Sequence, residues 1–166
     1  AARGNARSSS GTVALPAEQK IAVGGTRLPK AKIIQAKKMF RTNECDEENG
    51  EELYFAYGSE QMEDLLGDTT LTSADFMAIQ MLQDGAVGKR WGGFRWIPSE
   101  RMTLATTTRY TIAWAKSGLA LGVGAEIMTR VTERADKSYA MQPYARMSIG
   151  ATRIEDAKVV EIACNE

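Results

Sequence analysis

The sequence predicts an α+β fold whose sheet is mostly antiparallel. Apolar residues have helical spacing in much of the first half, whereas the second half alternates with a period of two. Helices followed by strands are typical of α+β proteins, and strands that succeed one another across glycines or charged turns pair antiparallel. A length of 166 residues fits one ordinary domain or two small subdomains.

Three segments have the spacing of amphipathic helices. The first is residues 30–40, with Thr26 as the expected cap and Pro29 in the first turn. The second begins at Ser59, where acidic residues of the first turn suit the helix dipole. The third runs from Thr72 or Ser73 to about Gln83. These segments supply the helical part of the predicted fold.

Strands are expected wherever short apolar runs or strict alternation occur. A brief strand is predicted near the start of the chain and another before Ser59, and the rest follow Gly93. Long alternation on both sides of residues 133–138 predicts extended strands there. The expected strands are residues 20–23, 53–57, 94–97, 109–114, 119–123, 127–131, 139–149 and 159–163.

Composition indicates a folded protein with a lean core. Leu, Ile, Val and Phe number 31 of 166, slightly below the one-fifth level at which disorder becomes plausible. Disorder also requires high net charge, and this chain has none. We therefore expect a subunit that finishes burying its apolar surface against neighbours.

The zero net charge hides a segregation along the chain. Residues 1–41 carry a balance of +8, residues 42–84 a balance of −12, and residues 85–166 a balance of +4. Such blocks can neutralise one another within the fold, or the acidic face of one molecule can meet the basic face of another. Clusters of solvated charge without a partner are the third interpretation.

Several functional classes are excluded. Zero histidine removes the commonest general base and zinc ligand, and two cysteines, Cys45 and Cys164, are too few for a disulfide framework and are expected as reduced thiols. The acidic loop 43–52 lacks the ligand spacing of a calcium site. The glycine-rich segments 85–90 and 122–124 fail the phosphate and dinucleotide motifs. We expect no enzyme, and no catalytic, cofactor or metal site.

Two clusters have residue types that occur in catalytic or binding sites, but neither is interpreted as such a site. Glu60 and Asp64 lie one helical turn apart, and we interpret them as solvated carboxylates of a first turn. The aromatic residues of segment 91–96 could stack nucleobases, but core packing is the favoured interpretation. No segment has the roughly 18 apolar residues of a membrane helix, and no secretory signal is expected.

The order of these elements, with several short phrases, resembles the major capsid proteins of tailed bacteriophages, which share the Hong Kong phage-type shell fold. The likeness covers residues 26–166, and no single phrase carries it. The segments are the helix at 29–40, the strand and capped helix at 53–66, the phrases at 71–76 and 81–85, the Trp-Gly-Gly segment 91–102, and the tail at 136–140, 147–153 and 159–162.

The resemblance implies a division into domains. Residues 29–118 and the final strand 151–166 would form the axial domain, around fivefold and sixfold centres, and residues 119–150 the returning strands of the peripheral domain. Residues 1–28 would be an extended arm or linker. Members of the family also have a long spine helix upstream of these elements, so we expect this chain to be a C-terminal portion.

The resemblance also implies function and partners. The expected role is a structural virion protein, assembled in the cytoplasm of a bacterial host, that builds an icosahedral shell around DNA from pentamers and hexamers of itself. Scaffold, portal and decoration proteins are further possible partners. Contacts with packaged DNA would be weak and unspecific, because the chain has no net basic charge. No cofactor and no membrane are expected.

Charge suggests which residues make subunit contacts. We expect basic residues in or beside the predicted peripheral hairpin to meet the acidic loop, or another acidic surface, of a neighbour. The candidates are Glu47, Glu48, Glu51, Arg130, Arg134 and Lys137. Two other functions stay open: a soluble α+β binding module that recruits a partner through its acidic face, and a shell protein of a bacterial compartment.

Overall fold

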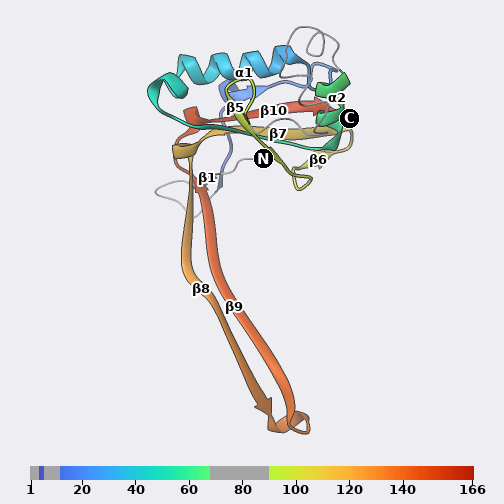
Figure 1. Ribbon diagram of the computed structural model, residues 1–166, viewed down its shortest axis with the longest axis vertical. Coiled ribbons are helices and arrows are strands. Elements are labelled where there is room, and N and C mark those ends of the chain that lie inside the picture. Colours follow the sequence, from blue (N-terminus) through green and yellow to red (C-terminus); the bar gives the residue numbers. More distant parts are fainter. Residues whose placement is uncertain (1–3, 6–11, 68–89) are drawn as a thin grey trace. The chain divides into compact units, whose positions relative to one another are not determined.

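The computed structural model describes residues 4–5, 12–67 and 90–166 (Figure 1). The helix expected from Thr72 or Ser73 to Gln83 lies outside these residues. The chain divides into two compact units, residues 1–119 with 153–166, and residues 120–152. We call them the sheet unit and the hairpin unit and describe each by itself.

The elements of the described residues follow the predicted order. Short 3-10 turns lie at Ala17–Gln19, Glu47–Asn49, Lys116–Gly118, Ala135–Lys137 and Asp156–Lys158. The helices and strands are β1 (Gly4–Asn5), β2 (Thr12–Val13), β3 (Lys20–Ile21), α1 (Lys30–Thr42), β4 (Leu53–Tyr57), α2 (Ser59–Gly67), β5 (Phe94–Pro98), β6 (Leu104–Ala105), β7 (Thr108–Ala115), β8 (Leu119–Arg134), β9 (Ala140–Arg153) and β10 (Val159–Asn165).

The sheet unit is built on one mixed sheet with the strand order β3-β10-β7-β4-β5 and with β6 beside β7. The pairs of β7 with β10, β4 and β6 are antiparallel, while β4 with β5 and β10 with β3 are parallel. The prediction of an α+β fold with a mostly antiparallel sheet is therefore confirmed. In Figure 1, β10 and β7 run side by side through its middle.

The core of the sheet unit lies between α1 and one face of the sheet. Apolar residues of α1 spaced as predicted, among them Phe40, join alternate residues of β7 in one buried cluster. The rings of Phe40 and Phe94 meet edge to face at 6.0 Å. Trp96 is 6% exposed and its ring lies 5.7 Å from that of Trp91, so the aromatic residues of 91–96 pack in and against the core, as predicted.

Two predicted boundaries are wrong. Thr26 does not cap α1, because its hydroxyl donates to the Val23 carbonyl in a turn, and the residue before the helix is Pro29. The proline side chain has no oxygen that could accept from the first helical amides, so the helix starts without a side-chain cap. The two strands expected at 119–123 and 127–131 are one continuous strand, β8, despite its glycines.

Both cysteines are buried and free, as expected for reduced thiols. Burial raises the pKa of each thiol above its usual value. A buried thiol with a raised pKa is a poor nucleophile, which agrees with a structural role for Cys45 and Cys164. Among the described residues, no helix is long and apolar enough to cross a membrane.

Candidate functional site

The hairpin unit consists of β8 and β9, which pair with each other and with no other strand of the described residues. Its register follows from two close approaches: a β-carbon on Gly122 would lie 3.8 Å from the Gly150 carbonyl oxygen, and one on Gly124 would lie 3.8 Å from Cβ of Ser148. Partner numbers thus fall along β9 as they rise along β8, so the strands are antiparallel. Odd-numbered residues of both strands consequently share one face, and even-numbered residues share the other.

The odd-numbered face is mostly apolar between its base and Glu133, the one charged residue on it, which lies near the tip. It carries no charged residue between positions 121 and 131 of β8 or between 141 and 151 of β9. Its large side chains lie open to solvent, from 49% to 68% exposed. We call this surface the apolar face; its large residues are Leu121, Val123, Ile127, Val131, Met141, Met147 and Ile149.

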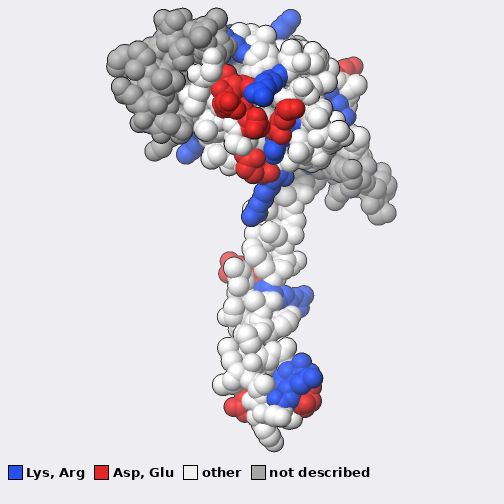
Figure 2. All heavy atoms as spheres, turned by 90° about the vertical axis from the view of Figure 1, so that its right-hand side faces the viewer, with Lys and Arg blue, Asp and Glu red and all other residues white. Residues whose placement is uncertain are grey.

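The even-numbered face and the tip carry the charges. Figure 2 shows them in a few places along an otherwise uncharged hairpin. At the tip, Arg134 Nε donates to Asp136 Oδ1 at 2.9 Å, and this contact lowers the pKa of the Asp136 carboxyl. Arg130 and Lys137 form no ion pair with the described residues. Of the three basic candidates from the sequence, Arg134 has a partner in its own hairpin.

The acidic candidates lie in the sheet unit, and each has a partner there. Glu47 forms an ion pair with Lys37, and Glu48 accepts two hydrogen bonds from Arg41, at 3.0 and 2.6 Å. Both bases belong to α1. Glu51 accepts a hydrogen bond from the Ser117 hydroxyl at 2.6 Å. The structure therefore places the acidic loop 43–52 against its own helix, which satisfies much of its charge within the chain.

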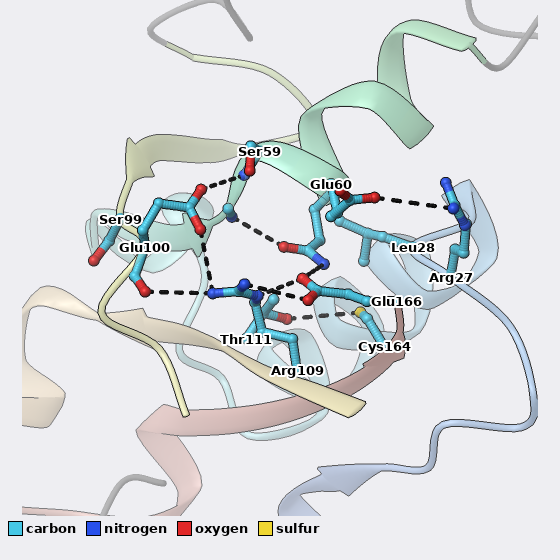
Figure 3. A network of polar contacts seen from close by, with 12 residues as sticks. Arg27, Leu28, Ser59, Glu60, Ser99, Glu100, Arg109, Thr111, Cys164 and Glu166 are labelled. Atoms are coloured by element: carbon cyan, nitrogen blue, oxygen red, sulfur yellow. Dashed lines mark hydrogen bonds and ion pairs between the residues drawn. The ribbon is translucent and has the colours of Figure 1, made fainter. Parts of the chain in front are cut away.

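A polar network that the sequence did not predict joins α2, β7 and the last residue (Figure 3). Arg109 forms ion pairs with Glu166 and with Glu100, the latter at 3.2 Å. Gln61, fully buried in α2, donates to Glu166 at 3.1 Å and accepts from the Gly58 amide at 3.1 Å. Its parts lie 105 positions apart in the sequence, so no local pattern marks it.

The interpretation of Asp64 as a solvated carboxylate is wrong. Its side chain is 11% exposed, and it accepts hydrogen bonds from Arg27 Nη1 at 3.0 Å and from the Leu28 amide at 3.1 Å. Glu60 remains 43% exposed, as expected. Asp64 thus anchors the chain ahead of α1. In the part of the chain that the structure describes, no group of three or more acidic, cysteine or histidine side chains could hold a metal ion.

Comparison with known proteins identifies a family over the whole chain. The family described as phage capsid protein matches residues 1–166. No curated protein matches the sequence.

Solved structures share the fold at low sequence identity. A chain from Mycobacterium phage Che8 is 18% identical with a TM-score of 0.66, and the match covers 87% of this chain and 53% of that one. The capsid structure of cyanophage P-SCSP1u is 16% identical with a TM-score of 0.59, covering 93% and 56%. The SrpI encapsulin of Synechococcus elongatus is 9% identical with a TM-score of 0.54, covering 89% and 53%. The chain thus spans about half the length of these proteins.

Proposed function

Because the chain belongs to the phage capsid protein family, we propose that it is a structural, non-catalytic part of a tailed-phage virion shell that assembles with copies of itself. In this proposal the sheet unit is the axial domain and the hairpin unit supplies strands of the peripheral domain. The observed division at residues 120 and 152 lies close to the expected 119–150 and supports the assignment.

The apolar face of the hairpin unit carries this proposal. A two-stranded hairpin is at best marginally stable alone in water, and this one exposes seven large apolar side chains on one side. Burying a Leu, Ile or Met side chain contributes about 1.5–3 kcal/mol, so covering the apolar face is strongly favourable. An exposed apolar surface of this length is typical of a subunit that buries it on assembly.

A charge placed on the apolar face should prevent assembly. We expect Ile127→Lys to abolish particles in negative-stain electron microscopy and to leave a small species in light scattering, because an unpaired ammonium cannot be buried cheaply. Met128→Lys is the matched control: Met128 is the next residue, similarly exposed at 56%, and lies on the other face.

The two variants together decide the proposal. Particles that form with Met128→Lys and not with Ile127→Lys support it. Equal assembly by both variants would contradict a role for the apolar face. Circular dichroism on both proteins shows whether the sheet unit remains folded in each case.

We propose further that the basic residues Arg130, Arg134 and Lys137 contact acidic residues of a neighbouring copy. Arg130 and Lys137 are the stronger candidates, since Arg134 already pairs with Asp136. Glu47, Glu48 and Glu51 could serve only by exchanging or sharing their present partners, so another acidic surface is the better match. Charge reversal at Arg130 and Arg134 should weaken assembly most at low salt, and unchanged assembly would remove this contact.

The wider setting belongs to the same proposal. Assembly would take place in the cytoplasm of a bacterial host, with scaffold, portal or decoration proteins as additional partners. Unspecific affinity for DNA rises with the number of phosphates that a protein neutralises. Contact with DNA would therefore be weak, because this chain has no net basic charge. The likeness to an encapsulin concerns the fold, and purified particles that contain a cargo enzyme in place of DNA would favour the compartment alternative.

A further inference from the structure

Residues 20–28, which we call the strap, lie along the outer edge of the sheet. The strap begins as β3, which pairs with β10 at only two positions, Lys20 with Glu161 and Ile21 with Ile162. It turns at Gly24 and Gly25, both with positive φ, and ends at buried Leu28. Two residue pairs are too few to hold a strand in place, so other contacts must fix it.

One buried ammonium group joins the strap to the last strand. Nζ of Lys32, in the first turn of α1, donates to the carbonyl oxygens of Val23 at 2.9 Å, Thr26 at 2.9 Å and Arg27 at 3.0 Å. It also donates to the carbonyl of Ala163 in β10 at 2.7 Å. Three of the four acceptors thus belong to the strap and the fourth to the strand beneath it.

The Lys32 side chain contributes its charge as well as its packing volume. Lys32 is 6% exposed, and burial lowers the pKa of its ammonium. No carboxylate lies within ion-pair distance of it among the described residues. An ammonium has three protons, and four carbonyl oxygens surround them, so the site is arranged for a cation held by backbone dipoles.

We propose that the Lys32 ammonium is a latch that holds the strap over the edge of β10. With the latch closed, the Asn165 amide donates to the Thr26 carbonyl at 3.1 Å and the strap covers the outer edge of the final strand. Without the ammonium, four carbonyl oxygens lose a charged donor, and the strap opens while the rest of the sheet keeps its ladder. An uncovered strand edge is a surface for pairing with another chain, and the closed strap keeps this edge of β10 covered.

Hydrogen exchange tests the latch. Lys32→Met keeps an unbranched chain of similar length and removes the ammonium. We expect the Asn165 amide to exchange on the order of tenfold faster, while the Leu28 amide, which Asp64 holds, and amides of the β4–β7 ladder keep their wild-type rates. Lys38→Met, at an exposed position of the same helix, is the control and should change neither. Wild-type exchange at Asn165 in Lys32→Met would overturn the proposal.

If Lys32→Met loosens the whole sheet, hydrogen exchange in that variant is not specific to the strap. Chemical rescue then tests the ammonium group separately. Lys32→Ala leaves room for the missing propylammonium group. We expect n-propylammonium chloride to restore slow exchange at Asn165, and equimolar n-propanol with sodium chloride not to restore it. Absence of rescue, or equal rescue by the alcohol, would show that the side chain acts by packing alone and would overturn the latch.

Discussion

Arg109 connects three parts of the chain that are far apart in the sequence. It lies in β7 and holds Glu100, from the loop after β5, together with Glu166 at the end of the chain. The side chains of Arg109 and Glu166 are 12% and 13% exposed, so water and salt screen this pair less than a surface pair. The hydrogen bond from Arg109 lowers the pKa of the Glu166 carboxyl.

Glu166→Gln should lower the free energy of unfolding by about 1–2 kcal/mol at pH 7, because a charge-assisted hydrogen bond becomes a neutral one. Since the folded pKa of Glu166 is below its unfolded value, this stabilisation is present above the unfolded pKa and is lost as pH falls through the folded pKa. Urea unfolding should therefore show a difference from wild type that shrinks below the usual glutamate pKa of 4.5.

Glu155→Gln is the control for this measurement. Glu155 pairs with Lys158 at 3.0 Å, but its side chain is 54% exposed. The urea midpoint of Glu155→Gln should hardly differ from that of wild type, at pH 7 or at acidic pH. A larger effect for Glu155→Gln than for Glu166→Gln would contradict the importance assigned to burial of the Arg109 pair.

At the scale of elements, Gly118 shows how closely two 3-10 turns of the sheet unit approach each other, Lys116–Gly118 after β7 and Asp156–Lys158 before β10. A β-carbon at this position would lie 2.8 Å from the carbonyl oxygen of Lys158, a backbone atom that cannot swing away. The Gly118 carbonyl also accepts a hydrogen bond from the Ile154 amide at 2.9 Å. The glycine therefore permits a close backbone approach beside the start of the final strand.

Gly118→Ala should destabilise the sheet unit by about 1–3 kcal/mol, the usual cost of overpacking. Gly150→Ala, in β9, is the matched control because a β-carbon there meets nothing within 4 Å. Thermal unfolding followed by circular dichroism compares the two. Equal melting temperatures would mean that the Lys158 backbone yields without cost.

Sequence periodicity predicts most elements of this fold and little of their pairing. The run Leu53–Tyr57 is the observed β4, and the alternation in 109–114 extends by one residue at each end in β7. Both patterns are local, so they are visible in one sequence. The parallel pair of β4 with β5 is not, because it depends on contacts between segments about 40 positions apart.

At the candidate site, too, local patterns are predictable from the sequence and long-range contacts are not. The alternation in 139–149 predicts one strand with an apolar side, but the union of the apolar sides of β8 and β9 into one face requires the register between these strands. The helical spacing of residues 30–40 does not indicate that Lys32 is buried. Its burial depends on the carbonyl of Ala163, 131 positions away, which no local pattern contains.

At the scale of the whole chain, the charge blocks are partly neutralised within the fold. Lys37 and Arg41 of the basic block pair with Glu47 and Glu48 of the acidic block, and Arg27 pairs with Asp64. The Arg41–Glu48 pair is exposed and contributes little to stability. All three pairs form within one chain, so they orient its segments and are not free to drive association. The apolar face of the hairpin unit is therefore the main source of assembly energy in this account.

Methionine oxidation measures the covering of that face directly. Met141 and Met147 lie on the apolar face, 66% and 49% exposed, and Met128 lies on the opposite face, 56% exposed. In the free chain, dilute peroxide should oxidise all three at comparable rates. In assembled particles we expect Met141 and Met147 to be protected at least about tenfold while Met128 still reacts. Oxidation of Met141 and Met147 at undiminished rates in intact particles would contradict the proposal that assembly buries the apolar face.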